Sequence, residues 1–336
     1  MFNKGVQNNE NFIKKLKEKI LLDKKIEFEE AKKLIEIKID DSDSLNELFS
    51  SADEIRKNFC GDSFDLCTII NAKSGKCSED CKYCAQSSHF KTNTDVYPLV
   101  SEEKALEEAK KVEREGAHRF SLVTSGKGVL DNSEELKKLE NIYKKLKAET
   151  TLSLCASHGI CSKEVLAKLK ESGVTTYHHN LEACADFYPS ICSTHTHEDR
   201  VKTVLAAKEV GLKVCSGGIL GLGETPIDRI KLAFELRELD IDSVPINILT
   251  PIPGTPLENS KEIEPLELVK TMAVFRFILP NKALRYAGGR VKLKEYQSLG
   301  IRAGINSALT GNFLTTTGNT IESDKKMIRG EGYEIK

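Results

Sequence analysis

Apolar and polar residues recur at helical spacing through the first 60 residues of the chain. Phe12, Leu16 and Ile20 stand four residues apart among lysines and glutamates, and a second series begins at Ala31. Residues spaced in this way share one face of an α-helix and leave the charged residues on the opposite face. The pattern predicts an N-terminal helical extension over residues 1–60.

From Phe64 onward, short apolar runs rich in β-branched residues alternate with amphipathic helical stretches. One strand and one helix together take roughly 30 to 40 residues, as a βα unit does. The rhythm continues almost to the C-terminus and yields eight predicted strands. They span Phe64–Asn71, His118–Thr124, Thr150–Cys155, Val174–Asn180, Lys213–Ile219, Ser243–Leu249, Ala283–Ala287 and Gly304–Leu309.

Helix-start signals stand between these strands. Ser101 is followed by two glutamates, Ser162 precedes another periodic stretch, and Thr225 is followed by a proline. Serine and threonine cap helices by accepting a backbone hydrogen bond, and proline suits the first helical position. Eight βα units with short turns favour a closed (β/α)8 TIM-type barrel over an open doubly wound sheet, with its chemistry on the loops that follow the strands. The predicted organisation is a helical extension at 1–60, the barrel at 61–315 and a polar C-terminal tail at 316–336.

Composition excludes several classes of function. The chain has 336 residues, with 50 Lys and Arg against 51 Asp and Glu, so it lacks the basic surface of a nucleic-acid-binding protein. No stretch approaches the roughly 18 apolar residues of a membrane span, and the N-terminus has no apolar signal segment. We therefore expect a cytoplasmic protein with a small-molecule partner, no nucleic acid and no membrane.

Ten cysteines in such a chain indicate metal or redox chemistry, because reducing compartments keep thiols free. Directly after the first predicted strand, Cys77, Cys81 and Cys84 form a CxxxCxxC array. Three thiolates on a 4Fe-4S cluster leave one iron open, and that iron can chelate S-adenosylmethionine and direct an electron into its sulfonium. The product is a 5′-deoxyadenosyl radical, which abstracts hydrogen from carbon. The alternative is a zinc knuckle completed by a distant Cys or His.

The array and its surroundings resemble a known family. Six segments occur in that family's order: DLCTIINAKSGKCSEDCKYCAQSS, TTYHHNLEA, STHTHEDRV, KVCSGGILGLGET, VPINILTPIPGTPL and RYAGGR. They are similar to motifs of the biotin synthases, within the radical S-adenosylmethionine superfamily, over about residues 55–315. The resemblance implies insertion of sulfur into dethiobiotin with a 4Fe-4S cluster, S-adenosylmethionine and an auxiliary iron–sulfur cluster, of the 2Fe-2S type or a variant. It also implies a flavodoxin- or ferredoxin-type electron donor and a homodimer.

The resemblance assigns several residues to S-adenosylmethionine. It implies that Tyr83 lies beside the adenine and that Arg200 approaches the carboxylate. It also implies that the GILGLGET segment, with Gly221 and Glu224, surrounds the methionine and ribose portions. The residue types suit these roles, because glycine allows close backbone approach and a guanidinium fork suits a carboxylate.

Polar residues near the end of the fourth predicted strand alternate in position. His178, Asn180 and Glu182 would face one side of the strand, toward the barrel lumen. The resemblance implies that Asn180 contacts S-adenosylmethionine and the ureido ring of the substrate, that Glu182 binds the ribose hydroxyls, and that Asn247 binds substrate. Two positions depart from the family, because His178 stands where Asn is common and Glu182 where Asp is common. An alternative is that His178 is a strand histidine without a ligand.

The expected ligands of the auxiliary cluster depart from the family in one place. The resemblance implies three cysteines on three strands plus an arginine; Cys155, Cys215 and Arg290 match, but Ser121 stands at the third cysteine position. Serine ligates iron only as an alkoxide, a harder and rarer ligand than thiolate. Cys161, on the loop after the strand of Cys155, is the nearest replacement. Our hypothesis is a cluster held by Cys155, Cys161 and Cys215 near Arg290, of the 2Fe-2S type or another nuclearity, with Ser121 as a neighbour.

Other cysteines and other functions are weaker alternatives. Cys184 and Cys192 lie on the following loop, while Cys60 and Cys67 fit a packed core or strand role. A different radical S-adenosylmethionine enzyme would keep the CxxxCxxC array without a sulfur source inside the barrel. A non-enzymatic iron–sulfur carrier or metal sensor would use the cysteines without a ligand pocket.

Overall fold

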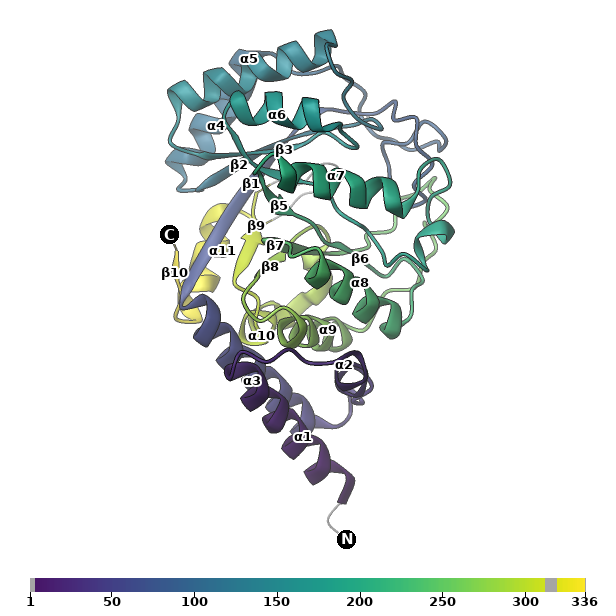
Figure 1. Ribbon diagram of the computed structural model, residues 1–336, viewed down its shortest axis with the longest axis vertical. Coiled ribbons are helices and arrows are strands. Elements are labelled where there is room, and N and C mark those ends of the chain that lie inside the picture. Colours follow the sequence, from purple (N-terminus) through teal and green to yellow (C-terminus); the bar gives the residue numbers. More distant parts are fainter. Residues whose placement is uncertain (1–3, 312–318, 336) are drawn as a thin grey trace.

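The computed structural model describes residues 4–311 and 319–335. Parallel strands form a closed barrel, which is the predicted (β/α)8 TIM-type fold (Figure 1). The strands are β1 (Ser63–Lys73), β2 (Arg119–Thr124), β3 (Ser153–Ser157), β4 (Val174–His178), β5 (Lys213–Cys215), β6 (Gly218–Leu220), β7 (Ser243–Ile248), β8 (Ala283–Tyr286), β9 (Ser307–Leu309) and β10 (Glu334–Ile335). Around the ring the order is β1-β2-β3-β4-β5-β7-β8-β9, with β6 on β7, and β9 pairs back with β1.

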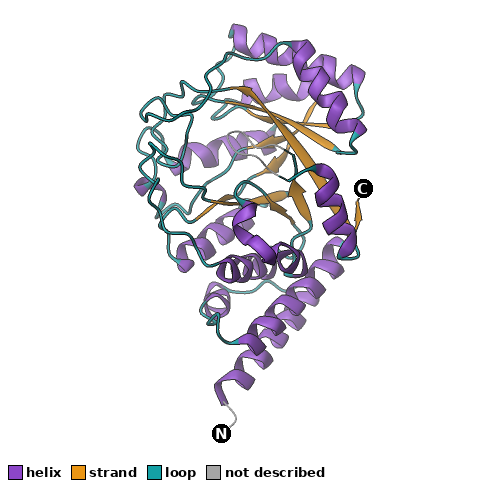
Figure 2. Cartoon of the chain, turned by 180° about the vertical axis from the view of Figure 1, so that it is seen from behind, coloured by secondary structure: helices purple, strands orange, loops and turns teal. Residues whose placement is uncertain are grey.

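Helices between successive strands cover the outside of the barrel (Figure 2). The three predicted caps, Ser101, Ser162 and Thr225, each accept a backbone N–H from the residue three positions later. No described helix combines the length and apolar character needed to cross a bilayer. The helices of the barrel are α4 (Glu102–Arg114), α5 (Glu134–Glu149), α6 (Lys163–Glu171), η1 (Tyr188–Ser190), α7 (His197–Glu209), α8 (Pro226–Glu238), α9 (Pro265–Ile278), η2 (Arg290–Tyr296) and α10 (Gln297–Arg302).

Every predicted strand has a counterpart in the barrel, but the fifth is broken. The run predicted over 213–219 forms β5 and β6, separated by Ser216 and Gly217. At the break the Gly217 N–H donates to Asn180 Oδ1 at 3.1 Å. A Cβ on Gly217 would lie 2.0 Å from the carbonyl oxygen of Pro245. Glycine is therefore required where this strand approaches its neighbour, and the break ties the strand to a predicted site residue.

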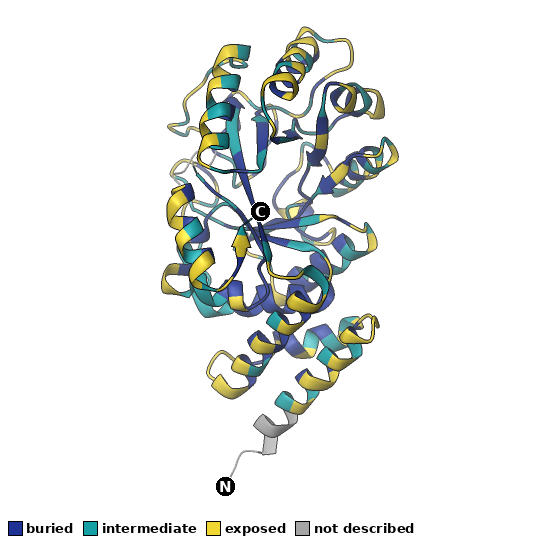
Figure 3. Ribbon diagram, turned by 90° about the vertical axis from the view of Figure 1, so that its left-hand side faces the viewer, coloured by how far each residue is buried: buried dark blue, intermediate teal, exposed yellow. Residues whose placement is uncertain are grey.

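The N-terminal helices share the core of the barrel. They are α1 (Lys4–Leu21), α2 (Phe28–Ile35) and α3 (Ser42–Cys60); α1 packs on α3, and α3 packs on α9. Leu16 and Ile20 are buried in the same apolar cluster as the barrel residues. Figure 3 shows that burial continues from the strands into the inner faces of these helices. The helical extension therefore packs on the barrel through hydrophobic contacts.

The C-terminal residues predicted as a polar tail carry regular structure. Helix α11 (Ile321–Gly330) is capped by Thr320, and β10 pairs in parallel with the start of β1. Tyr333 packs edge-on against Phe64, with ring centroids 5.7 Å apart. The predicted end of the barrel at residue 315 lies outside the described residues.

Candidate active site

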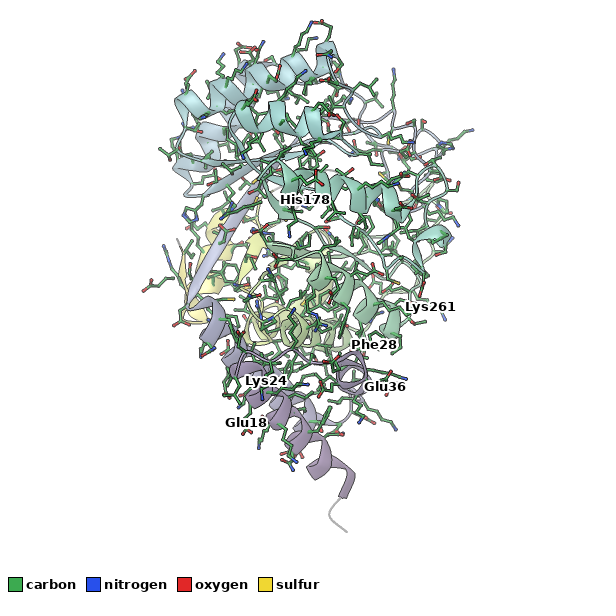
Figure 4. All side chains as sticks on the ribbon, viewed as in Figure 1. Glu18, Lys24, Phe28, Glu36, His178 and Lys261 are labelled. Carbon is green, nitrogen blue, oxygen red and sulfur yellow. The ribbon has the colours of Figure 1, made fainter. Side chains whose placement is uncertain are left out.

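A cavity of about 980 Å³ occupies the barrel lumen, from Cys60 at the start of the strands to Thr250 beyond their ends. Alternate strand residues line it, as the two-residue period of a strand requires. On β4, Thr176 and His178 line the cavity, whereas Tyr177 belongs to the outer apolar core. Figure 4 labels His178 within the barrel. Only every second residue of a strand points into the lumen, and this alternation decides which of the predicted strand residues line the cavity.

The three cysteines of the CxxxCxxC array lie on the loop that follows β1. Backbone hydrogen bonds shape the loop, including Ser88 N–H to Cys77 O at 2.8 Å and Cys84 N–H to Cys81 O at 2.9 Å. Cys81 is buried, Cys84 lines the cavity, and all three thiols are free. Burial raises the pKa of Cys84 to about 11. Three free thiols on one compact loop fit a 4Fe-4S cluster with one open iron, because cluster binding removes their protons.

Tyr83, Asn180 and Glu182 meet at the mouth of the cavity. Asn180 Nδ2 donates to Glu182 Oε2 at 3.2 Å, and the Tyr83 hydroxyl hydrogen-bonds the same carboxylate. Glu182 has φ +70°, a left-handed conformation that residues with side chains rarely adopt. Burial raises the pKa of Glu182, and Arg200 opposes that shift. Backbone strain beside a buried carboxylate is typical of a ligand site.

Arg200 of α7 lies at the same corner but does not line the cavity. Its Nη1 donates to the carbonyl oxygen of Asn180 at 2.9 Å and lies 3.9 Å from Glu182 Oε1. Its Nε donates to the Tyr188 hydroxyl at 2.7 Å. The structure thus brings Arg200, Asn180 and Glu182 together, and the guanidinium is held by hydrogen bonds to Asn180 and Tyr188.

Glu224 is turned away from the cavity. Its carboxylate oxygens accept the Gly221 N–H at 2.9 and 3.1 Å, and Nε of Arg229 donates to the same group at 2.8 Å. Gly221 has φ +101°, which a glycine tolerates and which lets the turn close on this carboxylate. Glu224 therefore shapes the turn after β6, where the sequence predicted a ligand contact.

Asn247 of β7 lines the cavity and bridges two neighbouring segments. Its Nδ2 donates to Gly218 O at 3.2 Å, and its Oδ1 accepts the Gly288 N–H at 2.9 Å. An amide nitrogen carries two N–H bonds, so one donor is left for a ligand. The structure holds this donor rigidly at the lumen wall.

Three other thiols, those of Cys67, Cys155 and Cys215, lie together deeper in the lumen. Cys67 of β1 and Cys155 of β3 lie close enough to influence each other's pKa, and Cys215 of β5 interacts electrostatically with both. Arg285 and Arg119 face the group. Burial raises the pKa of Cys215 to about 11, although both guanidinium groups act in the opposite direction. Thiols gathered beside fixed positive charge are suited to hold a second iron–sulfur cluster as thiolates.

Cys161 lies outside this group, which corrects the prediction made from the sequence. The Tyr177 hydroxyl donates to Cys161 Sγ at 3.2 Å, and the thiol also contacts the carbonyl oxygen of His158 at 3.6 Å. Because Tyr177 faces the helices, Cys161 is packed in the layer between strands and helices. It does not line the cavity that holds Cys155 and Cys215.

Arg290 also lies outside the lumen. Its Nη2 pairs with Asp324 Oδ1 of α11 at 2.6 Å, with both side chains buried, and its guanidinium lies over the Tyr286 ring. The arginine of the RYAGGR segment that faces the thiols is Arg285, which shares its strand face with Ala287. The sequence predicted Arg290 at this place, but Arg290 begins η2 beyond the end of β8, and Arg285 of β8 lines the lumen instead.

The sequence interpretation also missed the position of Cys67. Asp65 and Cys67 lie on the same face of β1 and line the lumen, and Ser121 lines it beside Cys155, its partner across β2 and β3. The available signal was that Asp65 and Cys67 stand two residues apart in this strand and therefore share one of its faces. A second missed feature is Cys192, whose Sγ lies 3.7 Å from Cys81 Sγ.

Sequence comparison finds relatives over nearly the whole chain. The family model described as the Radical SAM superfamily matches residues 72–236, and that of the Biotin and Thiamin Synthesis associated domain matches residues 245–334. The chain is 62% identical over 330 residues to a biotin synthase of Fusobacterium nucleatum subsp. nucleatum, covering 98% of this chain and 92% of the relative. It is 53% identical over 326 residues to a biotin synthase of Clostridioides difficile, covering 97% and 100%.

Two solved structures share the fold. Methylornithine synthase superposes with a TM-score of 0.82 at 21% identity, covering 96% of this chain and 97% of its own. The FeFe-hydrogenase maturase from Carboxydothermus hydrogenoformans superposes with a TM-score of 0.78 at 17% identity, covering 99% and 81%. At such identities the likeness concerns the barrel and its surrounding helices alone.

Proposed function

The chain belongs to the biotin synthase family, and from this premise we propose that it inserts sulfur into dethiobiotin by S-adenosylmethionine-dependent radical chemistry. One observation carries the proposal. A single cavity joins the CxxxCxxC loop at its mouth to a second group of cysteine thiols deeper in the lumen. A radical enzyme that moves no sulfur has no use for the deeper thiols, and a simple electron carrier has no use for the cavity.

Cys77, Cys81 and Cys84 are the proposed ligands of the radical-generating 4Fe-4S cluster. When bound, that cluster supplies the electron that cleaves the sulfonium of S-adenosylmethionine. In this proposal the rigid corner formed by Asn180, Glu182 and Arg200 receives the polar groups of S-adenosylmethionine. Fixed partners in a buried site orient the cofactor and exclude water from a reactive radical.

Dethiobiotin is proposed to lie between the mouth of the cavity and the deeper thiols. Asn247 offers its remaining N–H to the ureido ring, and Asn180 offers a second amide. Burial lowers the pKa of His178 to about 4, with Arg285 and Arg200 acting in the same direction. His178 is therefore neutral at physiological pH, and its imidazole can both donate and accept hydrogen bonds.

For the auxiliary cluster we propose Cys67, Cys155 and Cys215 as ligands, with Arg285 beside them. This set places three thiols in one lumen layer and needs no alkoxide from Ser121. The cluster supplies the sulfur that enters the product, and either a 2Fe-2S cluster or another nuclearity fits the three thiols. Arg285 supplies positive charge, and the barrel wall excludes water.

The proposed reaction is tested by anaerobic turnover with dethiobiotin, S-adenosylmethionine and a low-potential reductant, with the products identified by mass. We expect biotin together with 5′-deoxyadenosine and methionine. Release of 5′-deoxyadenosine without sulfur in the product would instead indicate another radical reaction on the same barrel. Redox cycling of the clusters without cleavage of S-adenosylmethionine would indicate an electron carrier.

We further propose a flavodoxin- or ferredoxin-type protein as electron donor, because one-electron reduction of a sulfonium needs a low-potential partner. A homodimer and a cytoplasmic location are proposed from the family. Ten free cysteines support a reducing compartment.

A further inference from the structure

A chain of four buried side chains connects Arg200 with the CxxxCxxC loop. Arg200 Nε lies 2.7 Å from the Tyr188 hydroxyl, and this hydroxyl lies 2.7 Å from His195 Nε2. His195 Nδ1 lies 2.6 Å from Glu79 Oε2. All four side chains belong to residues no more than 9% exposed.

One consistent set of donors and acceptors runs along this chain, starting from the arginine. An arginine can only donate, so the Tyr188 oxygen accepts from Arg200 and its own proton goes to His195 Nε2. The imidazole then carries its proton on Nδ1 and donates it to the Glu79 carboxylate. The other carboxylate oxygen of Glu79 accepts from the Ser78 hydroxyl at 2.9 Å. With these directions each hydrogen bond of the chain has one donor and one acceptor, and His195 Nδ1 also lies 3.4 Å from Cys192 Sγ.

The cysteine loop and the segment 191–195 are also joined by backbone hydrogen bonds. Asp80, which immediately precedes Cys81, accepts backbone N–H groups from Ser193 at 2.8 Å and Thr194 at 3.2 Å. The Lys82 N–H donates to the carbonyl oxygen of Ile191 at 2.9 Å. The segment 191–195 therefore lies directly on the cysteine loop, while Arg200 extends from the following helix α7.

We propose that Tyr188 and His195 are positioning residues that set the Arg200 guanidinium relative to the CxxxCxxC loop. The inference rests on the proposed function, in which Arg200 binds the carboxylate of S-adenosylmethionine and the loop holds the iron that the same molecule chelates. Because S-adenosylmethionine must reach both partners at once, a guanidinium at a fixed distance from the loop lowers the cost of ordering the complex. Tyr188 and His195 act through Arg200 and Glu79 and do not touch the reacting atoms.

The test uses cluster-loaded Tyr188→Phe and His195→Leu, each of which breaks the chain. S-adenosylmethionine binding is measured at equilibrium from its perturbation of the electron paramagnetic resonance signal of the reduced cluster. We expect roughly tenfold weaker binding in both variants, the effect of losing one buried hydrogen bond to a charged network. His195→Gln should restore binding to within about threefold, because its amide can accept from Tyr188 and donate to Glu79.

Tyr143→Phe is the matched control. Tyr143 and His158 form another buried tyrosine–histidine pair, with 2.9 Å between the hydroxyl and Nε2, away from the cysteine loop. Its removal should lower the melting temperature but leave S-adenosylmethionine affinity unchanged. A purely structural role for Tyr188 would make the two variants alike, with similar destabilisation and full affinity.

Each outcome decides the proposal. Wild-type affinity in Tyr188→Phe and His195→Leu overturns the inference but leaves the proposed function intact. A wild-type protein that binds no S-adenosylmethionine overturns the proposed function itself. If all three substitutions, including His195→Gln, prevent cluster loading, the chain serves to fold the loop, and the positioning role is refuted.

Discussion

Asp65 Oδ2 lies 2.6 Å from Arg285 Nη2, so this carboxylate fixes the arginine that faces the lumen thiols. The same oxygen accepts from Arg119 Nε at 3.0 Å. Burial would raise the pKa of Asp65, but the two guanidinium groups hold it below its usual value. The carboxylate is ionised at neutral pH, and the two arginines and one aspartate leave one net positive charge toward the thiols.

The identity of the third thiol ligand is the first prediction. Cys67→Ser should lose most of the auxiliary iron and sulfide, because serine ligates iron poorly. Cys161→Ser is the matched control and should keep both, since its thiol contacts Tyr177 outside the lumen. Anaerobic iron and sulfide counts with Mössbauer spectra measure the effect. Loss in Cys161→Ser together with retention in Cys67→Ser would return the ligand set to the one predicted from the sequence.

A second prediction separates Cys81 from its neighbour Cys192, whose thiol lies only 3.7 Å away. Cys81→Ala should abolish 5′-deoxyadenosine release, because two thiolates do not hold the radical-generating cluster. Cys192→Ala should retain release within about threefold, a change of less than 1 kcal/mol in the barrier. Chromatographic assay of 5′-deoxyadenosine under reducing conditions gives both values. Activity in Cys81→Ala would show that Cys192 can take its place as a ligand.

The stoichiometry of the reaction is a third prediction. Joining one sulfur to two carbons breaks two carbon–hydrogen bonds, and each needs its own radical. We therefore expect about two 5′-deoxyadenosine molecules for each biotin, after subtraction of release without dethiobiotin. Quantitative mass spectrometry with deuterated dethiobiotin measures the ratio. A ratio of one would contradict radical activation at both carbons.

Arg290 and Asp324 provide a stability prediction. Asp324→Ala leaves the buried Arg290 charge unpaired and should lower the free energy of unfolding by about 3–5 kcal/mol, whereas Arg290→Met with Asp324→Leu should recover most of it. Urea unfolding of cluster-free protein measures both changes.

In cluster-loaded protein, Arg285→Met should alter the auxiliary cluster spectrum and Arg290→Met should not. The reverse pattern would contradict the assignment of Arg285 to the lumen.

The buried His158 gives a pH prediction. Burial lowers its pKa to about 3, with Lys73 acting in the same direction, against about 6.5 in an unfolded chain. The unfolded state therefore binds more protons between these values, so stability is full above pH 6.5 and falls as the pH drops toward 3. Relative to His158→Gln, cluster-free wild type should lose on the order of 2 kcal/mol between pH 7 and pH 5. Parallel pH profiles of the two proteins would contradict this.

The barrel could be predicted from the sequence because each βα unit carries its own local signals. The caps at Ser101, Ser162 and Thr225 and the apolar runs between them depend on neighbours in the chain. The break at Gly217 could not be predicted in this way, since it depends on close approach to Pro245 on another strand. The same is true of β10, whose partner is the start of β1.

The candidate site was predictable where adjacent residues define it. The CxxxCxxC loop follows from local spacing, but Arg285 and Cys67 depend on which strand face turns inward, and that requires the register of neighbouring strands. Cys161 lies on the loop after β3, and its position depends on its contact with Tyr177 of β4. Glu224 faces away because Gly221 and Arg229 already bind its carboxylate. Both partners are close in the sequence, but the residue types alone do not say whether the carboxylate binds them or a ligand.

The pairing of β9 with β1 also governs when the protein can become complete during synthesis. Cys67 pairs with Leu309 across this closing seam. A chain that emerges from the ribosome N-terminus first cannot close the ring before its last tenth has appeared. Until then the edge of β1 that pairs with β9 has no partner strand, and the lumen thiols are exposed through this gap. Closure joins residues that are far apart in the sequence, so it carries the entropy cost of a long loop and is the slow step expected in folding. In a nascent chain the lumen cysteines are therefore accessible from this open side until β9 has been made.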